Sequence, residues 1–470
     1  MKLTAPFDNS YAALPDGFFT RTTPTPVADP KLLAFNAPLA KTLGITHGSS
    51  DDLAFIFGGN EVPEGADPLA QRYAGHQFGN YNPQLGDGRA ILLGEVLDQS
   101  GMRRDIQLKG SGRTPYSRGG DGRAWLGPVL REYVVSEAMH ALDIPTTRAL
   151  AAVQSGEDVF RETALPGAVL TRVAASHLRV GTFQVFAHRG EIENLRRLTD
   201  YAIQRHYPQA DGPLGLLRAV CAAQADLIAA WMSVGFIHGV MNTDNCAISG
   251  ETIDYGPCAF MDAFHPNRVF SSIDRQGRYA YANQPQIAVW NMAQLATSLL
   301  QQLDDPESGV AEATEIVHAM PALIEEAWLK RFAAKIGITT PKAEDPALID
   351  ALLSLMQTDG ADFTNAFHGL SGDTAADQFT DRASFANWHD AWQERIASEP
   401  DAIAVMKAAN PAVIPRNHRI EAMINAAVAG DMDPFHRLMA ALARPFEETD
   451  PDLHRAPTTQ EIVPATFCGT

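Results

Sequence analysis

Residues 238–256 read His238-Gly239-Val240-Met241-Asn242-Thr243-Asp244-Asn245-Cys246-Ala247-Ile248-Ser249-Gly250-Glu251-Thr252-Ile253-Asp254-Tyr255-Gly256. The apolar spacing before this stretch predicts a helix over residues 214–236, and the short apolar pairs after its polar turn predict a hairpin that delivers Asp254. Phosphotransfer enzymes use the order helix, catalytic loop, hairpin and metal loop to bring an Asp and an Asn/Asp pair to one nucleotide phosphate. An amide oxygen and a carboxylate also suit Mg²⁺, which prefers oxygen ligands. The stretch therefore indicates a phosphotransfer site.

A plainer interpretation of the same residues is a turn between two strands. Asn and Asp are common in such turns because their side chains bond to the neighbouring backbone. A single Asp-Tyr-Gly is also a weak motif. Taken alone, the stretch supports both interpretations about equally, and the upstream sequence has to decide between them.

Composition limits the class of protein. The chain has 470 residues, of which 45% are hydrophobic and 20% charged, and this is typical of a soluble globular protein with two or three structural units. Its formal net charge of -19 opposes binding to a nucleic-acid backbone. Cys221, Cys246, Cys258 and Cys468 form no CxxC pair, which fits a reducing compartment. We see neither a signal peptide nor a membrane span, so we expect a cytoplasmic protein with no membrane partner.

A glycine turn and a lysine-bearing strand precede the decisive stretch by more than a hundred residues. Residues 85–90 hold Gly86, Gly88 and Arg89, and two strands are expected at residues 91–97 and 104–109. Glycines let backbone N–H groups approach a phosphate, and Arg89 adds positive charge. Lys109 stands on the polar face of the second strand. Such a lysine is often simply solvated, but its place after a glycine turn matches a lysine that grips nucleotide phosphates.

A glycine-rich, basic loop and a helix come next. Residues 110–123 contain three arginines together with Asp121 and Gly122. This composition suits polyphosphate, although a flexible surface loop is the alternative. A helix is expected after Pro128, and Glu132 beside its apolar stripe is the candidate partner of Lys109, with Glu137 as second choice.

The remaining segments complete a small sheet and a helical part. Strands are expected at 147–153, 159–162 and 168–174 around a turn at 154–158, and helices at 287–300 and from about 311 onward. Arg172 and Arg179 lie near the expected junction of two lobes, where they reach either nucleotide phosphates or only solvent. Residues 1–80 predict an irregular extension. Within it, residues 73–79 are distinctive but chemically opaque, and His76 is expected to be a hydrogen-bonded structural residue.

Together these phrases resemble the selenoprotein O family of kinase-fold protein adenylyltransferases. The resemblance covers nearly the whole chain and is carried by Tyr73–Gly79, Leu85–Ala90, Gln107–Arg118, Gly120–Ala124, Ile144–Leu150, His238–Asn245, Thr252–Pro257 and Pro415–His418. It implies an α+β, protein-kinase-like bilobal fold with an irregular N-terminal extension and a helical C-terminal extension. The implied division is 1–80, then 81–171 as N-lobe, 172–325 as C-lobe, and 326–470.

The resemblance also implies an activity. ATP would bind turned round relative to ordinary kinases, so that AMP passes to Ser, Thr or Tyr hydroxyls of proteins and pyrophosphate leaves. The cofactor would be Mg²⁺, with Mn²⁺ as a substitute, and the partners would be ATP and protein substrates. A conventional phosphotransferase and an inactive nucleotide-binding pseudokinase are the alternatives that the residues themselves leave open.

Residue roles follow from the same resemblance. Asp244 would accept the hydroxyl proton, Asn245 and Asp254 would hold the metal, and Glu132 would orient Lys109. The implied ATP-binding residues are Gly86, Gly88, Arg89, Lys109, Asp121, Gly122, Arg172, Arg179 and Asp254. Family members often carry a C-terminal cysteine linked to redox control, and here Cys468, with Cys258 as a substitute partner, is the candidate.

Overall fold

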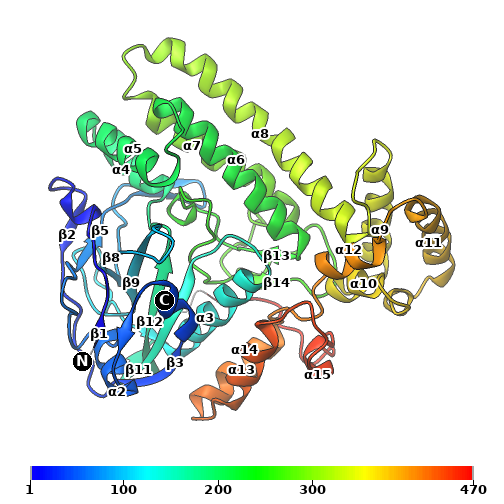
Figure 1. The fold of residues 1–470 in the computed structure, drawn as a ribbon, viewed down its shortest axis with the longest axis horizontal. Coiled ribbons are helices and arrows are strands. Elements are labelled where there is room, and N and C mark those ends of the chain that lie inside the picture. Colours follow the sequence, from blue (N-terminus) through cyan, green and yellow to red (C-terminus); the bar gives the residue numbers. More distant parts are fainter. Residues whose placement is uncertain (1–2, 468–470) are drawn as a thin grey trace.

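A computed structural model of the chain describes residues 3–467. Most strands precede residue 175, and the long helices follow (Figure 1). This segregation of strands from helices makes the fold α+β, as the sequence predicted.

An eight-stranded antiparallel sheet organises the N-terminal half. Along the sheet the order is β2 (Phe19–Arg21), β5 (Leu69–Gln71), β8 (Ala90–Leu97), β9 (Arg103–Lys109), β12 (Ala164–Ala174), β11 (Arg148–Phe160) and β3 (Lys31–Phe35), and β10 (Ala124–Trp125) pairs with β12. Three two-stranded ribbons lie outside it: β1 (Leu3–Thr4) with β4 (Thr46–His47), β6 (Gly75–Gln77) with β7 (Asn80–Asn82), and β13 (Phe236–Ile237) with β14 (Ala259–Phe260).

The first 80 residues are more regular than expected. Three of their segments, β2, β3 and β5, are strands of the main sheet, and β2 and β3 form its two edges. Helices α1 (Ala37–Thr42) and α2 (Ser50–Phe57) bury their apolar residues in a core shared with β8, β9 and β11. Strands this short, separated by Pro and Gly, show too little alternation to be recognised, and they gain their regularity by pairing with longer strands.

The turn expected at residues 154–158 is wrong. Strand β11 continues through these residues with a shift of register between Gln154 and Asp158. Gly156 has φ +71, a left-handed conformation that glycine tolerates at an irregularity of this kind. The chain instead reverses at residues 161–163, where β11 meets β12.

Helices cover the sheet and build the rest of the molecule (Figure 1). Helix α3 (Leu126–Ala141) packs on β11 and β12. The helices that follow are α4 (Val180–His188), α5 (Ile192–His206), α6 (Gly212–Ser233), α7 (Gln284–Leu300), α8 (Pro306–Lys335), α9 (Asp345–Asp359), α10 (Phe363–Gly369), α11 (Arg382–Ile396), α12 (Ala402–Ala409), α13 (Asn417–Val428), α14 (Asp433–Leu442) and α15 (Pro451–His454). Short 3-10 turns lie at Tyr11–Ala13, Thr243–Asn245, Tyr281–Asn283 and Ala375–Gln378.

Helix α6 is apolar on most of its surface because it is a core helix. By length and composition alone, α6 is long and apolar enough to span a membrane. No segment of this kind was expected from the sequence. Helix α6 packs against α7 and α8, and most of its apolar stretch is buried. The interior of a folded domain therefore accounts for its composition.

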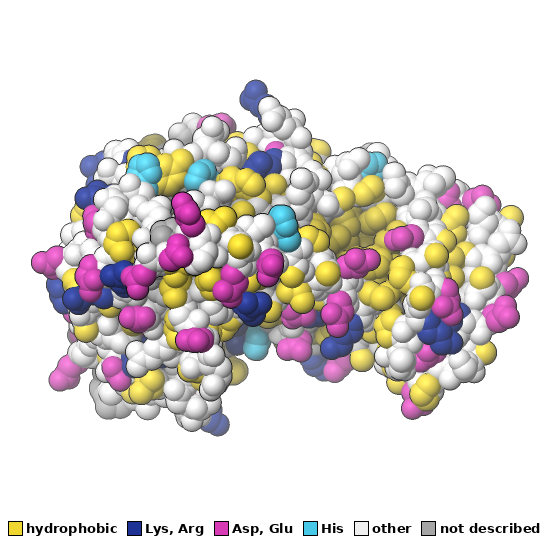
Figure 2. Space-filling view, turned by 90° about the horizontal axis from the view of Figure 1, so that it is seen from above, with side chains coloured by type: hydrophobic (Ala, Val, Ile, Leu, Met, Phe, Trp, Pro, Cys, Tyr) yellow, Lys and Arg dark blue, Asp and Glu magenta, His cyan; other side chains and the backbone are white. Residues whose placement is uncertain are grey.

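Helices α9 to α12 and the end of α8 form a second, smaller body with its own hydrophobic core, whereas α13 to α15 pack into the main core. Residues of α8 to α12 build this core around Phe332, Phe363, Phe367 and Trp392. Figure 2 shows the larger and the smaller body, with hydrophobic side chains in the hollow between them and charges of both signs scattered over the face.

Arg416, from the break at residues 415–418, joins the two bodies. Its guanidinium donates to Asp262 Oδ1 at 2.6 Å and to Asp362 Oδ2 at 2.8 Å. Asp262 follows β14, while Asp362 is the N-cap of α10, where its side chain accepts from Asn365 N. The side chain of Arg416 is only 1% exposed, so this bidentate pair lies in a region of low dielectric.

Replacing Arg416 with alanine is expected to lower the free energy of unfolding by about 3–5 kcal/mol, because the buried carboxylate of Asp362 and the partly buried carboxylate of Asp262 lose their counter-ion. Urea denaturation measures the change. The matched control is Arg437→Ala, which removes a half-exposed pair with Asp450 and should cost at most about 1 kcal/mol. Equal effects of the two substitutions would contradict a stabilising role for the buried pair.

A buried lysine makes the stability of the smaller body depend on pH. Lys335 is 2% exposed, its Nζ lies 4.3 Å from the centre of the Phe367 ring, and burial lowers the pKa of its amine to about 7. Between pH 7 and 10 the unfolded chain therefore binds a proton that the folded chain does not. The free energy of unfolding should rise with pH in this range.

We expect Lys335→Met to be more stable than the parent, and by a margin that shrinks by roughly 2 kcal/mol between pH 7 and pH 9. Denaturation of both proteins at the two pH values isolates this residue, since all other titrating groups are shared. A margin that does not change with pH would mean that Lys335 stays charged over the aromatic rings.

The end of the described chain returns to the region after the metal loop. Thr466 forms a parallel bridge with Ser271, its N–H donates to Phe270 O at 2.7 Å, and its hydroxyl donates to Pro257 O at 2.6 Å. Cys468 lies outside the described residues. Cys221, Cys246 and Cys258 are buried free thiols.

Candidate active site

One cavity of about 670 Å³ collects nearly all of the residues that the sequence singled out. Its lining includes Gly86, Gly88, Arg89, Lys109, Asp121, Gly122, Arg172, Arg179, Asp244, Asn245 and Asp254. Six arginines and one lysine face four aspartates in the described lining. In a chain of net charge -19, this local excess of positive charge favours an anionic ligand.

Lys109 is held by the carboxylate of α3. Its Nζ donates to Glu132 Oε2 at 2.6 Å, and the other oxygen of Glu132 accepts from Arg172 Nε at 2.8 Å. Glu132 lies behind the cavity wall and is 3% exposed. The second candidate, Glu137, is instead bonded to Arg148 and Asn36. The structure therefore places Glu132, and not Glu137, beside Lys109.

Three cations converge on Asp254. Lys109 Nζ lies 2.8 Å from Asp254 Oδ1, Arg172 Nη2 lies 2.5 Å from the same oxygen, and Arg179 Nη1 lies 3.3 Å from Oδ2. Burial alone would raise the pKa of Asp254, but Arg172, Lys109 and Arg179 hold it well below its ordinary value. Asp254 also has φ +61, a conformation that non-glycine residues seldom adopt. The arrangement gathers positive charge at one point where a polyphosphate would fit.

Asp244 lies in the short 3-10 turn after β13. Its backbone oxygen accepts from Arg179 Nη1 at 3.0 Å, and its side chain is almost fully buried. Burial raises the pKa of Asp244 to about 6, with Arg179 opposing the shift. The carboxylate is still mostly ionised at neutral pH, yet it accepts a proton more readily than an exposed aspartate does.

Asn245 and Asp254 present the oxygens that a magnesium ion prefers. Asn245 Nδ2 donates to Val240 O at 2.9 Å, which turns the amide oxygen of Asn245 away from that backbone group. Within residues 3–467 no cluster of three His, Cys, Asp or Glu side chains suits a metal. A cation between one amide and one carboxylate would keep several waters and take phosphate oxygens as ligands, as Mg²⁺ usually does. The residues present therefore fit Mg²⁺.

The glycine turn at residues 85–90 packs against the basic loop at residues 110–123. A Cβ at Gly86, which has φ +81, would lie 2.5 Å from the ring of Tyr116, so the loop can approach only a glycine here. Asp121 accepts from Arg161 Nη1 at 2.8 Å. The loop is thus tied to the β11–β12 hairpin, and it forms one wall of the cavity.

Comparison with known proteins agrees with this site. The family model described as protein adenylyltransferase SelO matches residues 1–443. The chain belongs to the SelO family. The protein nucleotidyltransferase YdiU of Roseobacter denitrificans is 69% identical over 470 residues, and the match covers all of both chains. Proteins with the same name from Ruegeria pomeroyi and Bradyrhizobium diazoefficiens are 68% and 56% identical, again over the full length of each chain.

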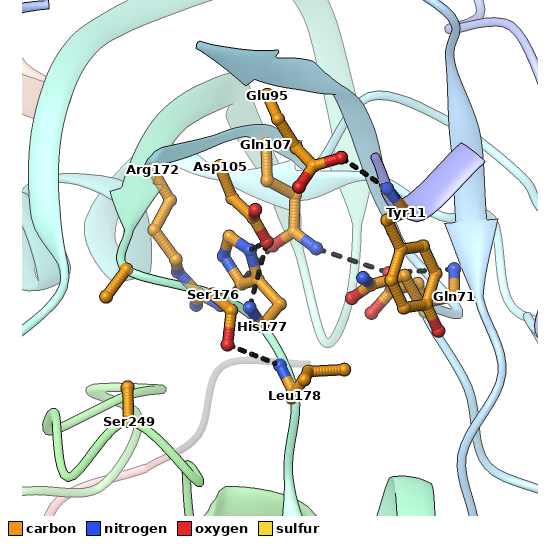
Figure 3. A network of polar contacts seen from close by, with 12 residues as sticks. Tyr11, Gln71, Glu95, Asp105, Gln107, Arg172, Ser176, His177, Leu178 and Ser249 are labelled. Atoms are coloured by element: carbon orange, nitrogen blue, oxygen red, sulfur yellow. Dashed lines mark hydrogen bonds and ion pairs between the residues drawn. The ribbon is translucent and has the colours of Figure 1, made fainter. Parts of the chain in front are cut away.

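In this SelO family member a buried polar network that includes Asp105, Gln107 and His177 lies beside Arg172 (Figure 3). Asp105 on β9 accepts from both the backbone N and Nδ1 of His177, each at 2.9 Å. Arg205 and His177 lower the pKa of Asp105 to about 2 against the effect of burial. The network anchors the segment between Arg172 and Arg179 to the sheet. It therefore fixes the backbone positions from which the two arginine side chains extend.

Sequence reasoning missed several residues of the SelO site. The ring of Tyr73 lies 4.4 Å from the guanidinium carbon of Arg179, in cation–π geometry. Asp87, between the two loop glycines, lies 3.7 Å from Arg179 and accepts from Gln107 Nε2 at 3.2 Å. His76, by contrast, is bonded to Gln184. The only signal for Tyr73 was the distinctive phrase at 73–79, whose contacts are far away in sequence.

Proposed function

We propose that the chain is an ATP-dependent protein adenylyltransferase that transfers AMP to hydroxyl groups of Ser, Thr or Tyr in proteins. The observation that carries the proposal is the convergence of Lys109, Arg172 and Arg179 on Asp254, in the cavity that also holds Asp244 and Asn245. Membership in the SelO family supports AMP transfer over phosphate transfer.

We further propose that the architecture is that of a bilobal protein kinase. A lysine on a sheet strand, paired with a glutamate on the helix packed against that sheet, is the arrangement of a kinase N-lobe. The catalytic turn at 243–245 and the metal loop at Asp254 follow helix α6, as in a kinase C-lobe.

In the proposed reaction the substrate hydroxyl oxygen forms a bond to the α-phosphorus of ATP. The bond from this phosphorus to the bridging oxygen breaks, and pyrophosphate leaves. Asp244 accepts the hydroxyl proton as the new bond forms. Lys109, Arg172 and Arg179 bind the β- and γ-phosphates and stabilise the negative charge of the leaving group.

Asn245 and Asp254 would hold Mg²⁺, which would neutralise phosphate charge when bound. In the structure, Asp254 is the anion that these three cations share. A triphosphate offers them more negative charge. We therefore infer that binding of ATP draws the cations from Asp254 and frees its oxygens for the metal.

The proposal is tested with ATP labelled at either the α- or the γ-phosphate, incubated with Mg²⁺ and the purified protein, with Asp244→Ala as the control. Label on protein from the α-position only, absent with Asp244→Ala, is the expected result. Label from the γ-position only would make the protein a conventional kinase. Nucleotide binding with no transfer from either position, on any protein in a lysate, would favour a pseudokinase.

A further inference from the structure

The segment at residues 73–79, whose chemistry the sequence left open, packs directly on the catalytic turn. It includes strand β6, which with β7 forms a short ribbon beside α4. His76 N donates to Thr243 Oγ1 at 2.7 Å, and Phe78 N donates to Asn242 Oδ1 at 3.0 Å. Two successive residues of the turn are therefore bonded to backbone groups of the ribbon.

Gln77 lies between these two anchored positions, and its side chain reaches the next residue of the turn. Its Nε2 donates to Asp244 Oδ2 at 3.1 Å. No other described side chain donates a hydrogen bond to this carboxylate. Gln77 also lines the cavity, so its contact with Asp244 is made inside the site.

The second oxygen of Asp244 is left without a donor. Asp244 Oδ1 is buried and has no hydrogen-bond partner among the described residues. A Cβ at Gly75 would lie 3.0 Å from this oxygen, so the ribbon contacts it closely without bonding to it. The environment of the carboxylate is therefore asymmetric: Oδ2 accepts from an amide inside the cavity, and Oδ1 is buried against the ribbon without a donor.

We propose that Gln77 is a positioning residue for the proton acceptor: its amide donates to Oδ2 inside the cavity and thereby holds the carboxylate of Asp244 in one orientation toward the substrate hydroxyl. The inference rests on the proposed function, in which Asp244 is the base. The torsion that turns a carboxylate about its last bond is broad. A fixed donor narrows it, and reactions between correctly oriented groups gain large factors in rate.

The test is the steady-state kinetics of AMP transfer in Gln77→Leu and Gln77→Glu. Both variants remove the amide donor, and the second keeps the size of the side chain but adds a negative charge. We expect kcat to fall about 10- to 100-fold, as when the partner that orients a functional group is removed, with KM for ATP and the unfolding midpoint nearly unchanged. Asn80→Ala, an exposed position in the same ribbon, is the control and should keep wild-type kinetics.

A double-mutant cycle with Asp244→Asn separates positioning from other roles. If Gln77 acts only through the carboxylate, Gln77→Leu should lower the rate no further in the Asp244→Asn background. Multiplied losses, or a raised KM with unchanged kcat, would make Gln77 a substrate contact and overturn the inference. So would wild-type kcat in Gln77→Glu.

The proposed function fails in a different way. Wild-type activity in Asp244→Asn would remove the base itself, whatever Gln77 does. An inactive Asp244→Asn beside a fully active Gln77→Leu would leave the base in place and refute only the positioning role.

Discussion

Asp254→Asn is expected to abolish AMP transfer, with kcat/KM reduced by roughly 10³-fold or more. The substitution keeps the size of the side chain but removes the negative charge that would hold Mg²⁺. It also leaves Lys109, Arg172 and Arg179 without the anion that they share in the structure. Binding of ATP should consequently lose its dependence on magnesium.

Calorimetric titration of ATP, with and without Mg²⁺, measures the second effect. Asp67→Asn is a suitable control because Asp67 forms a surface ion pair with Arg21, and neither residue lines the cavity. If Asp254→Asn binds ATP with the magnesium dependence of the parent protein, the metal is held elsewhere and the assignment of Asp254 is wrong.

Asp244→Asn is expected to separate chemistry from binding. Loss of a general base lowers kcat by about 10²- to 10⁴-fold. The affinity for ATP should change by less than about threefold. The cations that would bind the phosphates contact Asp254 and Glu132, and none of them forms an ion pair with the carboxylate of Asp244.

Single-turnover transfer and equilibrium binding of ATP should be measured on the same preparation. A parallel loss of both would indicate that Asp244 is a metal ligand, not a base. Retained transfer would refute both roles. Together, the two variants distinguish two roles: Asp254→Asn tests binding of the metal–nucleotide complex, and Asp244→Asn tests proton transfer.

Local patterns predicted those parts of the site that belong to one element each. The alternation along β9 predicted Lys109 on the polar face, and helical spacing predicted α3 with Glu132 beside its apolar stripe. Both predictions depend on contacts within a few residues, where sequence spacing fixes direction. The resemblance to a known family then supplied Arg172 and Arg179, whose approach to Asp254 no local pattern shows.

The parts that were missed depend on contacts between distant segments. Gln77 and Asp244 are 167 residues apart in sequence, and nothing in the phrase at 73–79 points to the catalytic turn. Strands β2 and β3 likewise become regular only at the edges of a sheet built by later residues. The raised pKa of Asp244 has the same origin, since burial is a property of the assembled cavity.

The bridge between Thr466 and Ser271 has a practical consequence for handling the protein. The hydroxyl of Thr466 is bonded to Pro257, three residues after Asp254, so this hydrogen bond ties the C-terminal segment to the metal loop. Cleavage by a carboxypeptidase that passes Thr466 would release the same loop. Loss of residues from Thr466 onward should therefore be checked by mass spectrometry before any preparation is judged inactive.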